Sequence, residues 1–136
     1  MVLIFWLSSR TATESSHQSG VILEWLINHF GDNFFTDFIV RKSAHFLEFA
    51  GLGFLFNISF YQTKKKKMPI VSVLASSLYA LSDEIHQLFV EGRSCQLSDW
   101  LLDSCGALFG AIAFLVLFAV INTVIKKKNT IDRKHI

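Results

Sequence analysis

The chain has 136 residues, 51% of them hydrophobic, and phenylalanine alone occurs 14 times. Its mean hydropathy is +0.41, and its formal net charge of +2 gives no overall basic character that would indicate a nucleic-acid partner. This length accommodates a single domain, and this composition is far from that of ordinary soluble proteins, so we expect an integral membrane protein in the lipid bilayer.

The residues that interrupt helices are few, with one proline and seven glycines in the whole chain. Long segments can therefore form continuous helices, which satisfy their own backbone hydrogen bonds within a bilayer. We predict an all-α fold, a polytopic transmembrane helix bundle. It would contain three full spans, a truncated first helix and a short interfacial helix.

The N-terminal segment, residues 1–7, is apolar but lacks a basic leader and is far shorter than the roughly 20 residues that a spanning helix needs. We interpret it as the remnant of a first transmembrane helix, from a misplaced start or a truncated gene. Residues 8–19 are polar and predict a loop. A short amphipathic helix is predicted to begin at Gly20, because the apolar residues Val21, Ile22 and Trp25 share one helical face. This helix either lies on the membrane surface or packs against the bundle.

Three longer segments follow. Gly31, Asp32 and Asn33 would end the amphipathic helix, and Thr36 with Asp37 would cap the next. The spans are then predicted over residues 43–62, from Pro69 to about Phe89, and from Ser98 or Asp99 to Ile125, with a disordered tail at residues 126–136 and a turn at 91–94.

Lysine runs set the expected topology. The positive-inside rule places residues 64–67 and 126–128 in the cytoplasm, which three successive spans satisfy. Arg41, Lys42 and Arg93 would then lie outside. Their positive charges oppose the rule weakly, which suggests that they are kept for a site.

Ionisable residues fall in one layer of the predicted bundle. With a rise of about 1.5 Å per residue, His45 and Glu48 lie roughly 24 to 29 Å from the nearest lysine run, and Asp83 lies roughly 24 Å from it. A hydrocarbon core of about 30 Å places these groups just inside the outer interface, where charges are costly and are usually functional. Asp99 and Asp103 reach the same level from the last helix.

Helical spacing predicts that these groups converge. Tyr79, Asp83, His86 and Gln87 share one face of their helix, with Glu84 at its edge. On the last helix, Asp99 and Asp103 lie on one stripe with Gly106 and Gly110, a small-xxx-small spacing that lets helices approach closely. We therefore expect an outward-facing polar pocket.

Several chemistries suit such a pocket. The spacings His45-x-x-Glu48 and Asp83-x-x-His86 are compatible with a divalent metal, although they are a weak signal. Clustered acids also suit proton transfer, and Arg93 suits an anionic phosphate oxygen. The alternative is a purely structural network of ion pairs and hydrogen bonds that joins the outer ends of the helices.

We assign candidate roles on this basis. The candidate catalytic residues are His45, Glu48, Asp83, Glu84 and His86. The candidate substrate-binding residues are Arg93, Gln87, Asp99, Asp103, Arg41 and Lys42. Cys95 and Cys105 have no metal-binding spacing, and we favour free thiols over a disulfide.

The motifs also resemble a known family. Four motifs carry the resemblance: the run RKSAHFLEF from Arg41, the run YA at Tyr79 followed by DEIHQLF from Asp83, the pair Gly92-Arg93 with Asp99, and Gly106 with Gly110. In order and spacing they are similar to the VanZ-like family of small bacterial membrane proteins. The similarity covers residues 41–110 of a single domain, residues 1–136, whose basic tail is residues 126–136. Glu91 and Asp103 depart from the residues common there.

This resemblance implies a multi-pass protein of the bacterial cytoplasmic membrane, in a family named for a protein associated with teicoplanin resistance. It implies no particular reaction or cofactor. We expect a protein that recognises or acts on a cell-envelope component, such as a lipid-linked phosphate or a peptidoglycan precursor. The alternative is a non-enzymatic membrane adaptor or a small proton-coupled permease.

Overall fold

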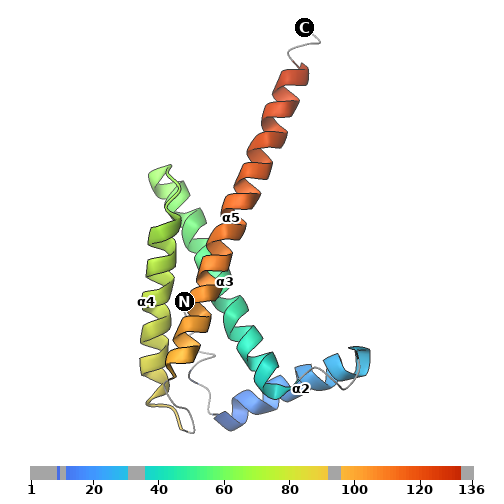
Figure 1. Ribbon diagram of the computed structural model, residues 1–136, viewed down its shortest axis with the longest axis vertical. Coiled ribbons are helices and arrows are strands. Elements are labelled where there is room, and N and C mark those ends of the chain that lie inside the picture. The colour runs from blue at the N-terminus through green and yellow to red at the C-terminus, as the bar shows by residue number, and fades with distance from the viewer. Residues whose placement is uncertain (1–8, 10–11, 31–35, 92–95, 133–136) are drawn as a thin grey trace.

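The structure, a computed structural model, describes residues 9, 12–30, 36–91 and 96–132. Within these residues the chain is all-helical, with no strand (Figure 1). The helices are α2 (Ala12–Phe30), α3 (Asp37–Lys64), α4 (Pro69–Gln87) and α5 (Leu97–Asp132). The helical fold class predicted from the sequence is therefore confirmed.

Local signals fix the ends of the central helices. The Thr36 hydroxyl oxygen accepts a hydrogen bond from the backbone N–H of Ile39 at 3.3 Å, which caps α3 as predicted. At the other end, Lys65 adopts a left-handed backbone with φ of 54° and donates its N–H to the Tyr61 carbonyl. Pro69 lies in the first turn of α4, where its missing N–H costs nothing.

Two predictions at the ends of the chain were wrong. The segment predicted as a loop, residues 8–19, is helical from Ala12. Within this helix the Ser19 hydroxyl donates to the Ser15 and Ser16 carbonyls, so that side chain is satisfied without leaving the helix. Helix α5 does not end at Ile125 but continues to Asp132, since lysine is a good helix former. The predicted remnant at residues 1–7, most of the turn at 91–94 and the last four residues of the predicted tail lie outside the described residues.

The helices have a distinct arrangement in space. Helix α5 packs chiefly against α3 and next against α4, while α2 packs against α3. Figure 1 shows α2 lying across the start of α3, at the end of the bundle where α4 ends and α5 begins. The connection between α3 and α4 lies at the opposite end, and the last third of α5 projects beyond it.

Glycines make the contact between α3 and α5 close. A Cβ atom added at Gly106 or Gly110 would overlap a backbone carbonyl group of α3, and one added at Gly53 would overlap the backbone of α5. The predicted packing role of Gly106 and Gly110 is confirmed. We call this contact the glycine seam, defined by Gly53, Gly106 and Gly110.

Helix α4 is polar inside and apolar outside. Its buried residues are Ser72, Ser76, Ala80, Asp83, Glu84 and Gln87. Its exposed large side chains are Ile70, Val71, Leu74, Leu78, Leu81 and Ile85. Soluble proteins usually show the opposite arrangement.

Only α5, among the described helices, is long and apolar enough to cross a membrane by length and overall composition. The candidate span covers Leu97–Ile131. The presence of this helix is consistent with a membrane protein.

Candidate functional site

Three carboxylates are buried where α4 ends and α5 begins. Asp83, Glu84 and Asp103 are only 3%, 1% and 1% exposed. They come from the last turns of α4 and the second turn of α5, which face each other in the bundle. We call these three residues the acidic cluster. Burial at this level is unusual for carboxylates unless each has a partner.

Glu84 has a structural partner. Its Oε2 atom accepts a hydrogen bond of 2.9 Å from the backbone N–H of Gln96, the residue that precedes α5. A helix start has unsatisfied N–H groups and a positive dipole end, so a carboxylate there is stabilising. Glu84 therefore attaches the end of α4 to the start of α5.

Asp83 and Asp103 are less well satisfied. Asp83 accepts a hydrogen bond through Oδ2 from the Gln87 side-chain amide at 3.3 Å. Among the described residues, Asp83 Oδ1 and both carboxylate oxygens of Asp103 have no hydrogen-bond partner. A buried carboxyl group without a hydrogen-bond partner costs free energy whether it stays charged or takes up a proton, so the fold retains Asp103 at a penalty.

The nearest described cations of α3 are paired elsewhere. The Lys42 ammonium forms an ion pair and hydrogen bond with Asp99 on α5, and each side chain is about three-quarters buried. The Arg41 guanidinium lies 3.4 Å from Asp37, one turn away on its own helix. The Lys42–Asp99 pair thus joins α3 to α5 at the edge of the acidic cluster.

Asp103 is surrounded by other acidic side chains. The other two members of the acidic cluster, together with Asp99 and Glu48, all repel negative charge on Asp103. Lys42 neutralises only Asp99 directly. Such a group attracts a proton, a cation or a ligand rich in N–H and O–H donors.

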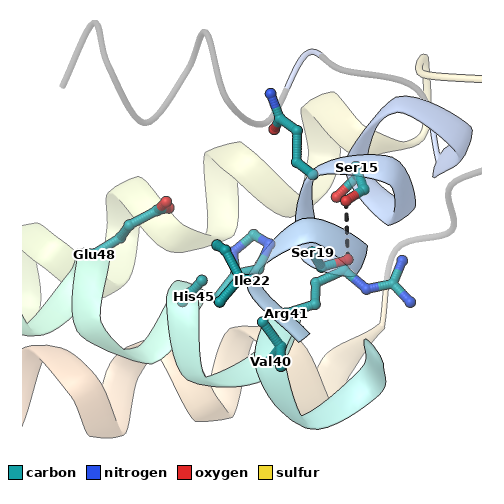
Figure 2. Close-up of a pocket in the computed structure, with 9 residues that line it drawn as sticks. Ser15, Ser19, Ile22, Val40, Arg41, His45 and Glu48 are labelled. Atoms are coloured by element: carbon teal, nitrogen blue, oxygen red, sulfur yellow. Dashed lines mark hydrogen bonds between the residues drawn. The ribbon is translucent and has the colours of Figure 1, made fainter. Parts of the chain in front are cut away.

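A second polar region lies between α2 and α3 (Figure 2). Its pocket has a volume of about 190 Å³ and is lined on the α3 side by Arg41, His45 and Glu48. The predicted site residues therefore divide into two groups. Glu48 belongs to both, because it lines this pocket and also acts electrostatically on Asp103.

The remaining predicted residues are placed as follows. Gln87 is buried beside Asp83, and His86 is half-buried on the same turn of α4. Arg93 and Cys95 lie outside the described residues. Cys105 is an exposed free thiol in the described part of the chain.

No metal-binding arrangement is present in the residues that the structure describes. Within them, no group of three or more His, Cys, Asp or Glu side chains is placed to hold a metal ion. The spacings His45-x-x-Glu48 and Asp83-x-x-His86, which are compatible with a metal site in the sequence, therefore do not bring three ligands together in the described part of the chain.

The sequence-based prediction missed several polar contacts near the cluster. The Trp100 indole N–H donates to the Ser77 carbonyl at 3.1 Å, and the Ser77 and Ser104 hydroxyls are 2.8 Å apart. It also missed Ser15 and Ser19, because their segment was predicted as a loop. One signal was available: Thr11 three residues before Glu14 matches the sequence of a helix-capping box.

Comparison with known proteins identifies the family. No curated protein and no solved structure matches the chain. The family model described as VanZ/LLP1 matches residues 1–120, a longer stretch than residues 41–110, which carry the motifs. The chain therefore belongs to the VanZ/LLP1 family.

Proposed function

We propose that this VanZ/LLP1 chain is a multi-pass membrane protein that recognises or modifies a cell-envelope component. The candidate components are a lipid-linked phosphate and a peptidoglycan precursor, and the proposal includes a role in glycopeptide resistance. The observation that carries the proposal is Asp103, which is buried without a hydrogen-bond partner among the described residues and surrounded by other carboxylates. Natural proteins keep such costly groups mainly where function requires them.

The surfaces of the helices support three spans. At 19 residues, α4 is about 28 Å long, close to the thickness of a hydrocarbon core. Its polar residues are turned inward and its outward residues are apolar, so its overall composition underestimates how well it fits lipid. The longer α3 also exposes Leu47 and Leu55. In the proposed topology both lysine runs are cytoplasmic and the acidic cluster is near the outer face.

The carboxylates of the acidic cluster limit the chemical groups of a substrate that this site would contact. Carboxylates repel an ionised phosphate but accept hydrogen bonds from hydroxyl, amide and ammonium groups. We assign Asp83 and Asp103 to such donors or to a transferred proton, with His86 and Gln87 beside them. Contact with an anionic oxygen falls to Arg93, as its sequence position suggests.

Part of the site is better explained by structure. Glu84 binds the Gln96 backbone, and Lys42 pairs with Asp99 across two helices. These contacts favour a positioning role for Glu84, Lys42 and Asp99 rather than direct contact with a substrate. The structural alternative therefore applies to the edge of the acidic cluster, and the functional proposal applies to Asp83 and Asp103.

The test uses two charge-neutral variants, Asp83→Asn and Asp103→Asn, expressed in a bacterial host that lacks its own copy. Glycopeptide susceptibility and the pool of lipid-linked precursors would be measured alongside membrane abundance. Ser82→Ala is the matched control, because Ser82 is exposed on the adjacent position of α4. We expect both Asn variants to lose the effect at normal abundance, while full activity in both would disprove the proposal.

A further inference from the structure

We infer a second binding site in this chain: the pocket between α2 and α3 binds the zwitterionic headgroup of a membrane phospholipid. The phosphodiester would contact Arg41, and a primary ammonium group would contact Glu48. This inference rests on membrane residence, which it shares with the proposed function, but not on any activity of the acidic cluster.

One face of α3 carries both charges. Arg41, His45 and Glu48 are spaced four and three residues apart, so they follow one another along the same face. The ends of this row are roughly 10 Å apart along the helix axis. Figure 2 shows Arg41 and Glu48 toward opposite ends of the pocket with His45 between them. The pocket therefore has a positive end and a negative end.

Arg41 retains donors for a phosphodiester. Its ion pair with Asp37 is long, at 3.4 Å, and both side chains are about one-third exposed. Such surface pairs within a helix contribute little to stability, so a ligand can compete for them. A guanidinium has five N–H donors, and its planar arrangement matches the oxygens of a phosphate group.

Helix α2 forms the opposite wall of the pocket. Ser15, Ser19 and Ile22 repeat at helical spacing and all line it. The buried Ser19 hydroxyl lies within hydrogen-bond distance of Asp37 on α3 and, at 3.0 Å, of the Ser15 carbonyl (Figure 2). The contact between Ser19 and Asp37 joins the two walls, so the pocket is formed before a ligand arrives.

The size and the rim of the pocket favour a lipid headgroup. A volume of about 190 Å³ is below the roughly 300–1,000 Å³ of pockets for drug-sized ligands, so a headgroup fits but its acyl chains do not. Ile22 at the rim continues into exposed Val21 and Trp25 on α2. Tryptophan is enriched at membrane interfaces, so the acyl chains would lie along this apolar surface.

The charges select among lipids. Glu48 would repel a headgroup that has only negative charge, whereas it accepts hydrogen bonds from a primary ammonium. A trimethylammonium group has no N–H and is usually held by aromatic rings. The described lining of this pocket has no Phe, Tyr or Trp, so phosphatidylethanolamine fits better than phosphatidylcholine or phosphatidylglycerol.

Native mass spectrometry of the full chain tests the inference. The protein in detergent micelles would be offered equal amounts of phosphatidylethanolamine, phosphatidylcholine and phosphatidylglycerol. We expect a preference of about tenfold for phosphatidylethanolamine, the effect of roughly one charged contact. Glu48→Gln should remove the preference over phosphatidylglycerol, and Arg41→Gln should weaken retention of all three lipids.

Two further variants keep the result interpretable. Ala44→Leu fills the pocket without changing charge and should reduce retention, because Ala44 lines it. Lys127→Gln removes an exposed charge from the far end of α5 and should change nothing. Equal retention of the three lipids by the unaltered chain would overturn the inference even if every variant misfolded.

The source of the headgroup is tested separately. Soluble glycerophosphoethanolamine carries the same charges without acyl chains, and we expect it to be retained far less than the lipid. Equal retention would contradict a membrane lipid as the ligand. Asp103→Asn should leave lipid preference unchanged, so failure of the lipid site and failure of the proposed envelope function would be distinguished.

Discussion

Two adjacent stretches of α5 differ sharply in how they are packed. At Gly110 the helix backbone contacts the backbone of α3 so closely that no Cβ atom would fit. Only two turns earlier, Asp103 is equally buried but has no hydrogen-bond partner among the described residues. The glycine seam provides close backbone packing between α3 and α5, whereas the acidic cluster contains a buried carboxyl group without a hydrogen-bond partner among the described residues.

This difference in packing suggests that the glycine seam serves stability and that the acidic cluster serves function. A chain selected only for stability would place an apolar or amide side chain at position 103, as it has placed small residues along the glycine seam. We therefore regard the seam as the element that sets the distance between α3 and α5. The cluster is the element that this packing holds in place.

The largest effect is expected from disturbing the glycine seam. Gly110→Ala should lower the free energy of unfolding by about 2 to 3 kcal/mol, because the added Cβ meets the Ala50 backbone, which cannot move aside cheaply. Gly51→Ala is the matched control on α3. A Cβ there meets nothing within 4 Å, so the substitution should stabilise the helix by up to about 1 kcal/mol.

Both glycine variants would be measured by denaturant unfolding in mixed micelles. Equal effects from the two would show that the close contact between α3 and α5 is not the basis of the packing.

An intermediate effect is expected at the edge of the acidic cluster. A double-mutant cycle with Lys42→Met and Asp99→Asn should give a coupling energy of about 1 kcal/mol, because the pair is largely buried and joins two helices. The matched pair Arg41 and Asp37 lies within one helix and is more exposed. The coupling energy between Arg41 and Asp37 should be about 0.3 to 0.5 kcal/mol. A value larger than that for Lys42 and Asp99 would contradict the conclusion that the pair between the two helices is the more stabilising one.

A smaller effect is expected from a single hydrogen bond between α4 and α5. Trp100→Phe removes the indole N–H that donates to the Ser77 carbonyl and should cost about 0.5 to 1 kcal/mol in the free energy of unfolding. Trp25→Phe, on the exposed surface of α2, should change stability by less. A reversed order would indicate that α2 contributes more to the fold than the contact between α4 and α5.

Local rules in the sequence predicted much of the fold. Thr36 marks a helix start because its hydroxyl accepts a backbone hydrogen bond, and Pro69 marks one because it has no N–H to leave unsatisfied. The spacing of Gly106 and Gly110 marks a close contact between helices. These signals depend on residues near one another in the chain. The early start of α2 was missed because serine and threonine side chains compete for backbone hydrogen bonds and are therefore typical of loops, whereas Ser19 donates within its own helix.

The composition of the candidate site was harder to predict. Depth along the helices placed Asp83 and Asp103 in one layer, and both side chains are buried in the bundle, where Asp83 acts electrostatically on Asp103. It placed His45 in the same layer, but depth does not determine which side of α3 a residue occupies. The glycine seam fixes the rotation of α3 against α5, and His45 with Arg41 consequently faces α2. That rotation depends on contacts between distant residues.

The most direct test of the comparison is the stability of Asp103→Asn. Asparagine has nearly the same shape but no charge, so we predict a free energy of unfolding within about 0.5 kcal/mol of the unaltered chain, or higher, together with lost envelope function. Denaturant unfolding in mixed micelles measures it. A loss of more than about 2 kcal/mol would show that Asp103 is part of a stabilising network and would contradict its assignment to a functional site.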